Sequence, residues 1–347
     1  LVDQSGMQAA IDWLGAELFT VGPVSDALAW LVIGLFVLAG GVEWYGRRSD
    51  ADLMSTARPI AAAAWVGFGL FWLNLFPAFA FEHQSFVEGI LSLAAFPACL
   101  YVAKHLYAGR DTLFVLSRAV AVMGLIYLPF ETIPAVTLAG TTLPAPRQFL
   151  IEYVAVLTGD IISLFGYSPA LIESSEGYMA TYQWILEDGH RYNVSIVLAC
   201  TGLGSIAIFG GLIAAVRAPL NRKLRGLAVA VPTIFVLNVF RTAFISIASG
   251  TQLMHWFPEA VLFMFGETNP YRVSFLVSDR IISQLLAVVA LIGITYLVAR
   301  QLPALLTVLE DILYVLTGEE HDLQAALDLP REPAVDQPEA NRVGRAD

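Results

Sequence analysis

Residues 192–211 read YNVSIVLACTGLGSIAIFGG. The stretch combines an apolar run with residues that seldom occur within a membrane span. Most of the stretch is apolar enough to enter a lipid bilayer, yet a thiol at Cys200 and a flexible glycine at Gly202 interrupt it. A buried cysteine usually serves packing, but a thiol can also bind metal, undergo redox chemistry or act as a nucleophile. Composition, topology and the residues near Cys200 decide which of these roles the thiol has.

The composition indicates a protein that crosses a membrane several times. The 347 residues are 57% hydrophobic and only 14% charged, which is too apolar for a soluble domain of this length. Several apolar runs exceed the roughly 18 residues that indicate a spanning helix. We therefore expect an all-α polytopic membrane protein. No signal peptide is expected, because the start lacks a basic region and a small-residue cleavage site.

The charge balance is acidic, with a net charge of −11, and lysine occurs only at Lys104 and Lys223. Acid-rich, lysine-poor surfaces stay hydrated in concentrated salt, so the composition suggests a halophilic archaeon or bacterium. An ordinary acidic tail is the alternative explanation. A net acidic chain gives no reason to expect a nucleic-acid partner.

The two cysteines, Cys99 and Cys200, lie in different apolar segments and form no CxxC pair. No His or Cys neighbours stand at metal-ligand spacing, so we expect no metal site and no other cofactor. Cys99 has no charged or strongly polar neighbours in LAAFPACLYV, so we expect its side chain to serve packing.

Apolar runs and basic loops together predict the topology. Clusters of Arg and Lys follow the first, third and fifth apolar runs, whereas the loops after the second and sixth contain neither residue. The positive-inside rule then places the N-terminus outside and the tail inside. The seven predicted spans are residues 27–46, 60–81, 86–104, 112–130, 194–216, 226–249 and 272–299.

Two further segments are predicted to lie along the membrane surface. Residues 147–166 contain Glu152 and Asp160, whose burial in lipid would be costly. We expect an interfacial helix on the outer face there, with an eight-span count as the alternative. Residues 8–19 have a similar amphipathic pattern.

The last third of the chain divides into a motif-bearing part and a tail. β-rich stretches flank Asp188-Gly189 within 178–198 and predict an extracytoplasmic hairpin. The catalytic domain is expected to comprise residues 1–301, with its motifs between 188 and 284. Residues 302–347 predict a cytoplasmic acidic tail that starts amphipathic and ends disordered.

Three unusual residues are predicted at one depth. Cys200, Arg241 and Arg280 each lie seven or eight residues from the outer end of their predicted spans, or about 10–12 Å at the α-helical rise. If 192–198 is a strand, Cys200 is shallower but on the same side. Burying one arginine costs about 2.5 kcal/mol or more, and two neighbours repel unless an anion lies between them. Asp279 and a Cys200 thiolate are the candidates.

This arrangement suits nucleophilic catalysis. A cation favours the thiolate, which is the reactive form of cysteine, and a second guanidinium can stabilise an oxyanion. Asn238 lies with Arg241 on a polar face of the sixth span, and Asp279 precedes Arg280 in VSDRIISQ. Taken singly, each of these residues has a plainer explanation, since a lone cysteine packs and a lone arginine snorkels. Their coincidence at one depth favours function.

The motifs VLACTGLGS, NVFRTAFI and VSDRIIS, in this order, resemble the exosortase/archaeosortase family, and within it the archaeosortases of halophilic archaea. The resemblance covers residues from about 27 to 300. It maps the nucleophile to Cys200, the first catalytic arginine to Arg241 and the third catalytic position to Arg280. Many exosortases have His at that third position, and Arg is a poor general base.

The resemblance implies a membrane-embedded cysteine transpeptidase with a thioacyl intermediate. Such an enzyme cleaves a C-terminal sorting signal of surface proteins such as the S-layer glycoprotein. The signal is a Pro-Gly-Phe motif, a hydrophobic helix and a basic tail. Cleavage is coupled to attachment of a membrane polar lipid, at a site facing the extracytoplasmic side of the cell membrane.

Three other classes of protein are alternatives to this one. A retinal protein needs a lysine within its last span, which this chain lacks. A transporter could use intramembrane arginines to bind an anionic substrate. A scaffold without catalysis would tolerate substitution of Cys200, Arg241 and Arg280 alike, whereas a transporter would tolerate loss of the thiol alone.

Overall fold

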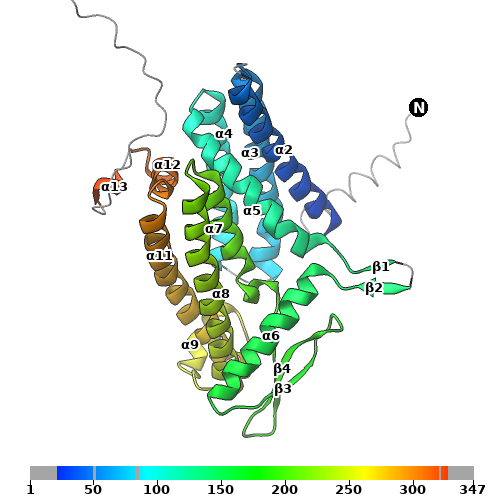
Figure 1. Cartoon of the computed structure of the whole chain (residues 1–347). Coiled ribbons are helices and arrows are strands. Elements are labelled where there is room, and N and C mark those ends of the chain that lie inside the picture. The colour runs from blue at the N-terminus through cyan, green and yellow to red at the C-terminus, as the bar shows by residue number, and fades with distance from the viewer. Residues whose placement is uncertain (1–21, 50–51, 83–85, 139, 320–321, 327–347) are drawn as a thin grey trace, which may run out of the picture.

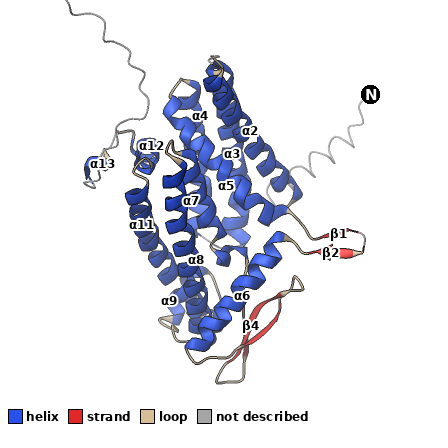
Figure 2. Ribbon diagram, viewed as in Figure 1, coloured by secondary structure: helices blue, strands red, loops and turns tan. Residues whose placement is uncertain are grey.

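The computed structural model describes residues 22–49, 52–82, 86–138, 140–319 and 322–326. Long helices form one bundle, and small sheets gather at one of its ends, which we call the hairpin end (Figures 1 and 2). The amphipathic helix predicted for residues 8–19 lies outside the described residues.

Six of the described helical stretches are long and apolar enough to cross a membrane. They are Pro23–Arg48, Met54–Ala80, Glu88–Tyr107, Asp111–Thr132, Leu220–Gly250 and Pro270–Gln301. The helices within them are α2 (Pro23–Arg48), α3 (Met54–Pro77), α4 (Phe86–Tyr107), α5 (Phe114–Thr132), α8 (Leu220–Gly250), α10 (Val273–Phe275) and α11 (Gln284–Gln301). The described chain is thus a mostly helical, polytopic membrane protein.

The predicted span 194–216 differs from a simple helix. Strand β5 (Arg191–Ser195) leads into a 3₁₀ turn, η3 (Leu198–Thr201), and only then into α7 (Leu203–Ala215), a shorter apolar helix. Cys200 therefore precedes the helix instead of lying seven residues inside it. Because β5 pairs with a neighbouring strand, the backbone of this segment is satisfied without helical bonds.

A three-stranded antiparallel sheet forms from β3 (Ala170–Glu173), β4 (Met179–Ile185) and β5 in that order. A hairpin turn joins β4 to β5, with Leu186 donating its N–H to the His190 carbonyl at 2.9 Å. Gly189 has a φ of +80°, which glycine adopts without strain. The hairpin therefore lies where the Asp-Gly pair predicts, and its side of the membrane stays a prediction. A second hairpin, β1 (Val136–Leu138) with β2 (Thr141–Leu143), was not predicted.

Helix α6 (Pro146–Leu164) runs obliquely between the sheet and α8 (Figure 1). The Tyr182 hydroxyl of β4 donates to the Ala155 carbonyl of α6 at 2.5 Å, and Gly159 leaves space for that hydroxyl. α6 is not among the six long apolar stretches. Its predicted interfacial position is compatible with its length and its Glu152 and Asp160, and stays a prediction.

At the opposite end of the bundle, a buried carboxylate links three segments of the chain. Glu43 of α2 is 2% exposed and pairs with Arg47 of its own helix at 2.5 Å and with Arg118 of α5 at 3.1 Å. Arg217, before α8, approaches the same carboxylate at 3.8 Å. Since an unpaired buried charge is strongly unfavourable, Glu43 needs these partners, and it holds the ends of three segments together.

Beyond α11, helix α12 (Leu305–Thr317) is followed by the short α13 (Leu323–Ala326). Leu302, Leu305 and Val308 are fully buried in the main core. The Arg110 guanidinium lies 3.4 Å above the Tyr314 ring, which adds a cation–π contact between α12 and the α4–α5 loop. The start of the predicted tail thus packs against the bundle, while residues 327–347 lie outside the described part.

Helices α5 and α7 approach each other closely at Gly211. A Cβ on Gly211 would collide with the Ala119 carbonyl oxygen and lie 3.2 Å from Met123. Glycine at this position lets two backbones approach, as small residues commonly do between membrane helices.

Gly211→Ala should therefore destabilise the fold by about 1–3 kcal/mol, because a backbone oxygen cannot move aside as a side chain can. The midpoint of thermal unfolding in detergent measures the effect. Gly293→Ala is the matched control, since a Cβ there meets nothing within 4 Å. Equal unfolding midpoints for the two variants would contradict the tight α5–α7 contact.

Candidate active site

Cys200 is held in a short turn at the start of α7. Its N–H donates to the Val197 carbonyl at 2.8 Å, and Thr201 Oγ1 donates to the Leu198 carbonyl at 2.7 Å. Gly202 then takes a φ of +76°, a left-handed conformation that ends the turn and starts the helix. In the Cys-Thr-Gly sequence, Thr201 thus supplies the side-chain hydrogen bond of the turn, and Gly202 allows the chain to change direction into α7.

Helix α8 fixes this turn from the side. Asn238 Nδ2 donates to the Cys200 carbonyl, and Thr242 Oγ1 lies 3.2 Å from the same oxygen. A Cβ on Gly202 would come within 3.1 Å of the Asn238 side chain, so only glycine allows this approach without displacement. Asn238 and Thr242 are four residues apart on α8 and flank Arg241, which brings that guanidinium to the side of the bundle where Cys200 lies.

Arg241 pairs with Asp279 across two helical segments. Arg241 Nη2 donates to Asp279 Oδ1 at 2.6 Å, and Arg280 Nε lies 3.5 Å from Asp279 Oδ2. One carboxylate therefore stands between two guanidiniums, as the sequence requires if both arginines are to lie in adjacent spans. Cys200 is half-buried.

Asp279 and Arg280 lie on a stretch of π-helix, η5 (Leu276–Ser283). A π-helical turn contains an additional residue, so side chains leave the axis at angles that an α-helix does not offer. Such turns are rare and occur frequently at functional sites. The π-helix is the local structure that carries the Asp279 carboxylate opposite Arg241 of α8.

A second set of contacts joins the hairpin to the same helical stretch. The Tyr271 hydroxyl, in η4 (Pro270–Arg272), donates to Asp188 Oδ2 at 2.6 Å. The His190 ring stacks on the Tyr271 ring with centroids 4.1 Å apart. Gln252 Nε2 donates to the Tyr271 carbonyl at 3.0 Å. The hairpin that precedes Cys200 is thus tied to the segment that precedes Asp279 and Arg280.

The hydrogen bond from Tyr271 lowers the pKa of the Asp188 carboxyl, and the backbone N–H of His190 acts in the same direction. A carboxyl whose pKa is lowered on folding stabilises the fold above its ordinary pKa. That contribution is lost as the pH falls through the lowered value. At neutral pH the contact is therefore fully formed.

The structure brings together every predicted site residue: Cys200, Asn238, Arg241, Asp279 and Arg280 lie at the hairpin end on neighbouring elements. Sequence reasoning missed the roles of Gln252 and Tyr271, which no motif singles out. It also missed Trp184 Nε1, which donates to Ser246 Oγ of α8 at 3.2 Å. The Asp-Gly hairpin signal was the only clue that residues near 188 lie beside the site.

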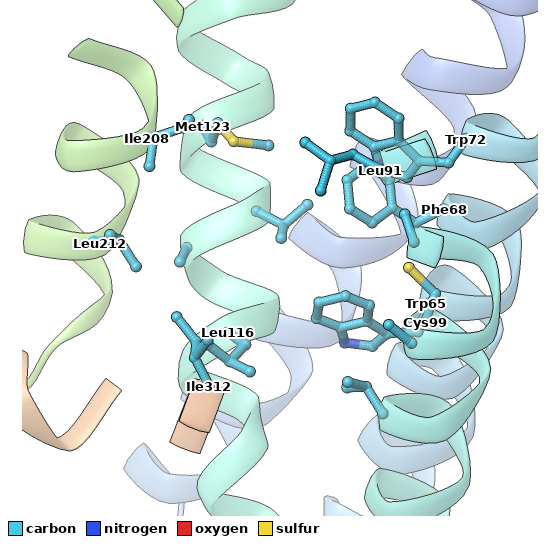
Figure 3. Close-up of a pocket in the computed structure, with 15 residues that line it drawn as sticks. Trp65, Phe68, Trp72, Leu91, Cys99, Leu116, Met123, Ile208, Leu212 and Ile312 are labelled. Atoms are coloured by element: carbon cyan, nitrogen blue, oxygen red, sulfur yellow. The ribbon is translucent and has the colours of Figure 1, made fainter. Parts of the chain in front are cut away.

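Cys99 lies in a different environment. It is 4% exposed and lines a wholly apolar pocket of about 440 Å³ between α3, α4, α5 and α7, with Ile312 of α12 at one end (Figure 3). Trp65, Phe68 and Trp72 form one wall of that pocket. These surroundings agree with a packing role. Among the described residues, no three His, Cys, Asp or Glu side chains gather as a metal site would require.

Several long apolar helices are typical of a multi-pass integral membrane protein, and here a cysteine and two arginines lie at one end of the bundle. Residues 16–271 match the family model of transmembrane exosortase (Exosortase_EpsH). The chain belongs to the exosortase family.

Two characterised relatives are similar over most of their length. Archaeosortase A of Haloferax volcanii is 58% identical over 308 residues, which cover 89% of this chain and 99% of that protein. Archaeosortase A of Natronomonas pharaonis is 42% identical over 308 residues, covering 87% and 91% respectively. No solved structure matches the chain.

Tyr271→Phe should loosen the hairpin tip, because it removes the hydroxyl that Asp188 accepts while keeping the ring that stacks on His190. We expect several-fold faster amide hydrogen exchange in residues 186–192. Tyr153→Phe, at an exposed tyrosine of α6, is the matched control. Unchanged exchange in the Tyr271 variant would mean that stacking alone holds the tip.

Proposed function

We propose that the chain is a cysteine transpeptidase that removes C-terminal sorting signals from surface proteins and joins the new C-terminus to a membrane lipid. The observation that carries this proposal is the Cys200 turn, bonded to α8 beside the Arg241–Asp279 pair. The similarity to archaeosortase A supports it. Sorting signals of the Pro-Gly-Phe type, on proteins such as the S-layer glycoprotein, are the proposed substrates.

In the first stage the Cys200 thiolate attacks the carbonyl carbon of the scissile peptide bond. Arg241 favours the thiolate, since a nearby cation stabilises the nucleophilic form. Arg280 stabilises the negative charge that develops on the substrate oxygen, as oxyanion-hole donors do in other acyl transfers. The C–N bond then breaks, the amine of the hydrophobic helix leaves with a proton, and a thioester remains on Cys200.

Asp279, Asn238 and Thr242 act as positioning residues in this scheme. Asp279 keeps two guanidiniums in one polar site, where they would otherwise repel each other. Asn238 and Thr242 bind the Cys200 carbonyl and so fix the height of the thiol relative to Arg241. A turn held from two sides retains its geometry while the acyl group is exchanged.

In the second stage a nucleophilic group of a polar lipid attacks the thioester carbonyl. The lipid loses a proton, the C–S bond breaks, and the thiolate of Cys200 is restored. We infer that the hairpin end faces the extracytoplasmic side, because the basic residues Arg47, Arg118 and Arg217 gather at the other end around Glu43. The reaction then takes place where surface proteins and outer-leaflet headgroups meet.

Cys200→Ala should abolish processing, whereas Cys99→Ala should retain it. The test expresses each variant in cells that lack the endogenous enzyme. A tagged reporter ends in Pro-Gly-Phe, a hydrophobic helix and a basic tail. Mass spectrometry of its C-terminus should show tail loss and a lipid-sized mass gain with wild type and Cys99→Ala only.

Arg241→Ala should lower the processing rate by about 10²–10³-fold, the range typical of losing one stabilising donor. Arg241→Lys keeps the charge but replaces the planar guanidinium by an ammonium of different reach, so partial activity is expected. Full processing by Cys200→Ala, with loss in Arg241→Ala, would refute the transpeptidase and favour a transporter for an anionic substrate.

A further inference from the structure

The wholly apolar pocket that Cys99 lines is large for a space between packed helices. Its volume is about 440 Å³, and aromatic and aliphatic side chains form its walls (Figure 3). The Trp65 indole N–H already donates to Ser117 Oγ at 2.9 Å. Water needs two to four polar partners, which such walls do not supply, and the cost of unfilled volume rises with its size. The pocket therefore suits an apolar occupant.

The pocket is elongated along the helix axes. Its lining follows α4 from Leu91 to Val102, which are eleven residues apart, or about 16 Å at the α-helical rise. On α5 the lining runs from Leu116 to Met123. A lipid chain occupies one leaflet, or about 15 Å of a hydrocarbon core that is about 30 Å thick. The length of the pocket thus matches one lipid chain.

A peptide helix does not fit the same space. An α-helix with its side chains is about 10–12 Å wide, so over this length it would need roughly three to four times the volume of the pocket. The hydrophobic helix of a sorting signal is therefore too thick to enter. A single hydrocarbon chain is the membrane component that remains.

The pocket is open toward the hairpin end and closed deeper in the bundle. Leu91 of α4 is 62% exposed and Ile208 of α7 is 47% exposed, and both line the half of the pocket nearer the hairpin end. In the other half, Val102 and Leu116 are buried, and Ile312 of α12 lies at that end (Figure 3). Exposed apolar surfaces of spanning helices face lipid, so a chain enters from the leaflet at the hairpin end.

Helices α5 and α7 connect the open end of the pocket to the nucleophile. On α7, Gly204 lies one turn before Ile208, and Cys200 precedes Gly204 by four residues. On α5, the Tyr127 ring would lie 4.0 Å from a Cβ on Gly204, and its hydroxyl donates to Glu131 Oε2 at 3.1 Å. Tyr127 and Cys200 pack against the same hydrophobic cluster. Polar groups thus begin one turn beyond the pocket, where the headgroup of a bound lipid would follow its chain.

We propose that the apolar pocket binds one hydrocarbon chain of a membrane lipid from the leaflet at the hairpin end, and that the headgroup of this lipid lies beyond Ile208 on the side of Cys200. The bound lipid is the acceptor of the second stage, a step that rests on the proposed transpeptidase function. A chain held in the pocket restricts the movement of the headgroup and raises its effective concentration at the thioester relative to water.

The transfer step balances without an additional reagent. A bond forms between the headgroup nucleophile and the acyl carbon, and the C–S bond to Cys200 breaks. The sulfur leaves as a thiolate, and the proton of the headgroup nucleophile is released to water at the hairpin end. The pocket itself takes no part in bond making, so its contribution is to hold the acceptor.

A photoreactive lipid tests occupancy of the pocket without relying on activity. Full-length Cys200→Ala protein is placed in nanodiscs that contain a dialkyl phospholipid with a diazirine at the end of one chain. Mass spectrometry then maps the cross-linked residues. We expect cross-links at Trp65, Cys99 and Leu116, which line the pocket but are buried from the surrounding lipid. Cross-links confined to exposed residues such as Val288 of α11 would overturn the lipid site.

Filling the pocket supplies the matched variants. Ala98→Phe places a ring in the pocket and should lower cross-linking at the buried positions about tenfold while leaving that of α11 unchanged. Ala95→Phe does the same nearer the open end, should Ala98→Phe fail to fold. Ala63→Phe is the control, since Ala63 is an exposed residue of α3 outside the pocket.

A substitute nucleophile tests the role of the lipid as acceptor. With purified enzyme and the sorting-signal reporter, Ala98→Phe should yield about tenfold less lipid-bearing product, because its thioester lacks a positioned acceptor. Hydroxylamine is small and soluble and does not need the pocket. It should restore turnover of the Ala98→Phe protein to within about twofold of wild type, by cleaving the thioester to a hydroxamate. Ala63→Phe should match wild type in both assays.

The outcomes separate the lipid site from the proposed function. Cross-links at the buried residues with unchanged lipid-bearing product in Ala98→Phe would refute the acceptor role and leave a structural lipid. Labelling of the same residues by a diazirine placed in the hydrophobic helix of the reporter would make a peptide the occupant and overturn the lipid site. Processing that persists in Cys200→Ala would refute the transpeptidase, whatever the cross-links show.

Discussion

The ion pair between Arg241 and Asp279 is the interaction on which the remainder of the site depends. A guanidinium in a membrane span needs a counterion, and the 2.6 Å contact provides it from the neighbouring segment. That contact fixes the rotation of η5 relative to α8. Arg280 then lies 3.5 Å from the second carboxylate oxygen. Replacing one member would leave a charge without compensation in a partly buried site.

The Cys200 turn adds a second constraint. A strand, a 3₁₀ turn and a helix succeed one another within residues 191–215, so the thiol depends on contacts from outside its own segment. Asn238 and Thr242 supply those contacts from α8, and Trp184 of the sheet bonds to Ser246 of the same helix. The nucleophile is therefore positioned by tertiary structure more than by local sequence.

Sequence alone predicted the apolar helices, the hairpin turn and the residues that meet at the site, because hydropathy, Asp-Gly turns and intramembrane charges carry strong physical signals. The predicted span 194–216 starts the helix too early, and the alternative of a strand at 192–198 fits better, since a run such as VSIVLAC satisfies strand and helix equally. Sequence alone could not foresee the Asp188–Tyr271 contact or the π-helix. The contact depends on how segments about 80 residues apart pack together, which no local pattern records, and the π-helix has no sequence signal of its own.

The π-helix has a consequence for the last long helix of the bundle. One additional residue in a helical turn rotates everything beyond it by about 100° relative to an uninterrupted α-helix. The faces that α11 presents to its neighbours are therefore set by the geometry around Asp279 and Arg280. Deleting one residue from Leu276–Ser283 would remove the widened turn and would also turn the apolar surface of α11 away from its present contacts. The same π-helical turn therefore sets both the geometry of the site and the rotation of the C-terminal span.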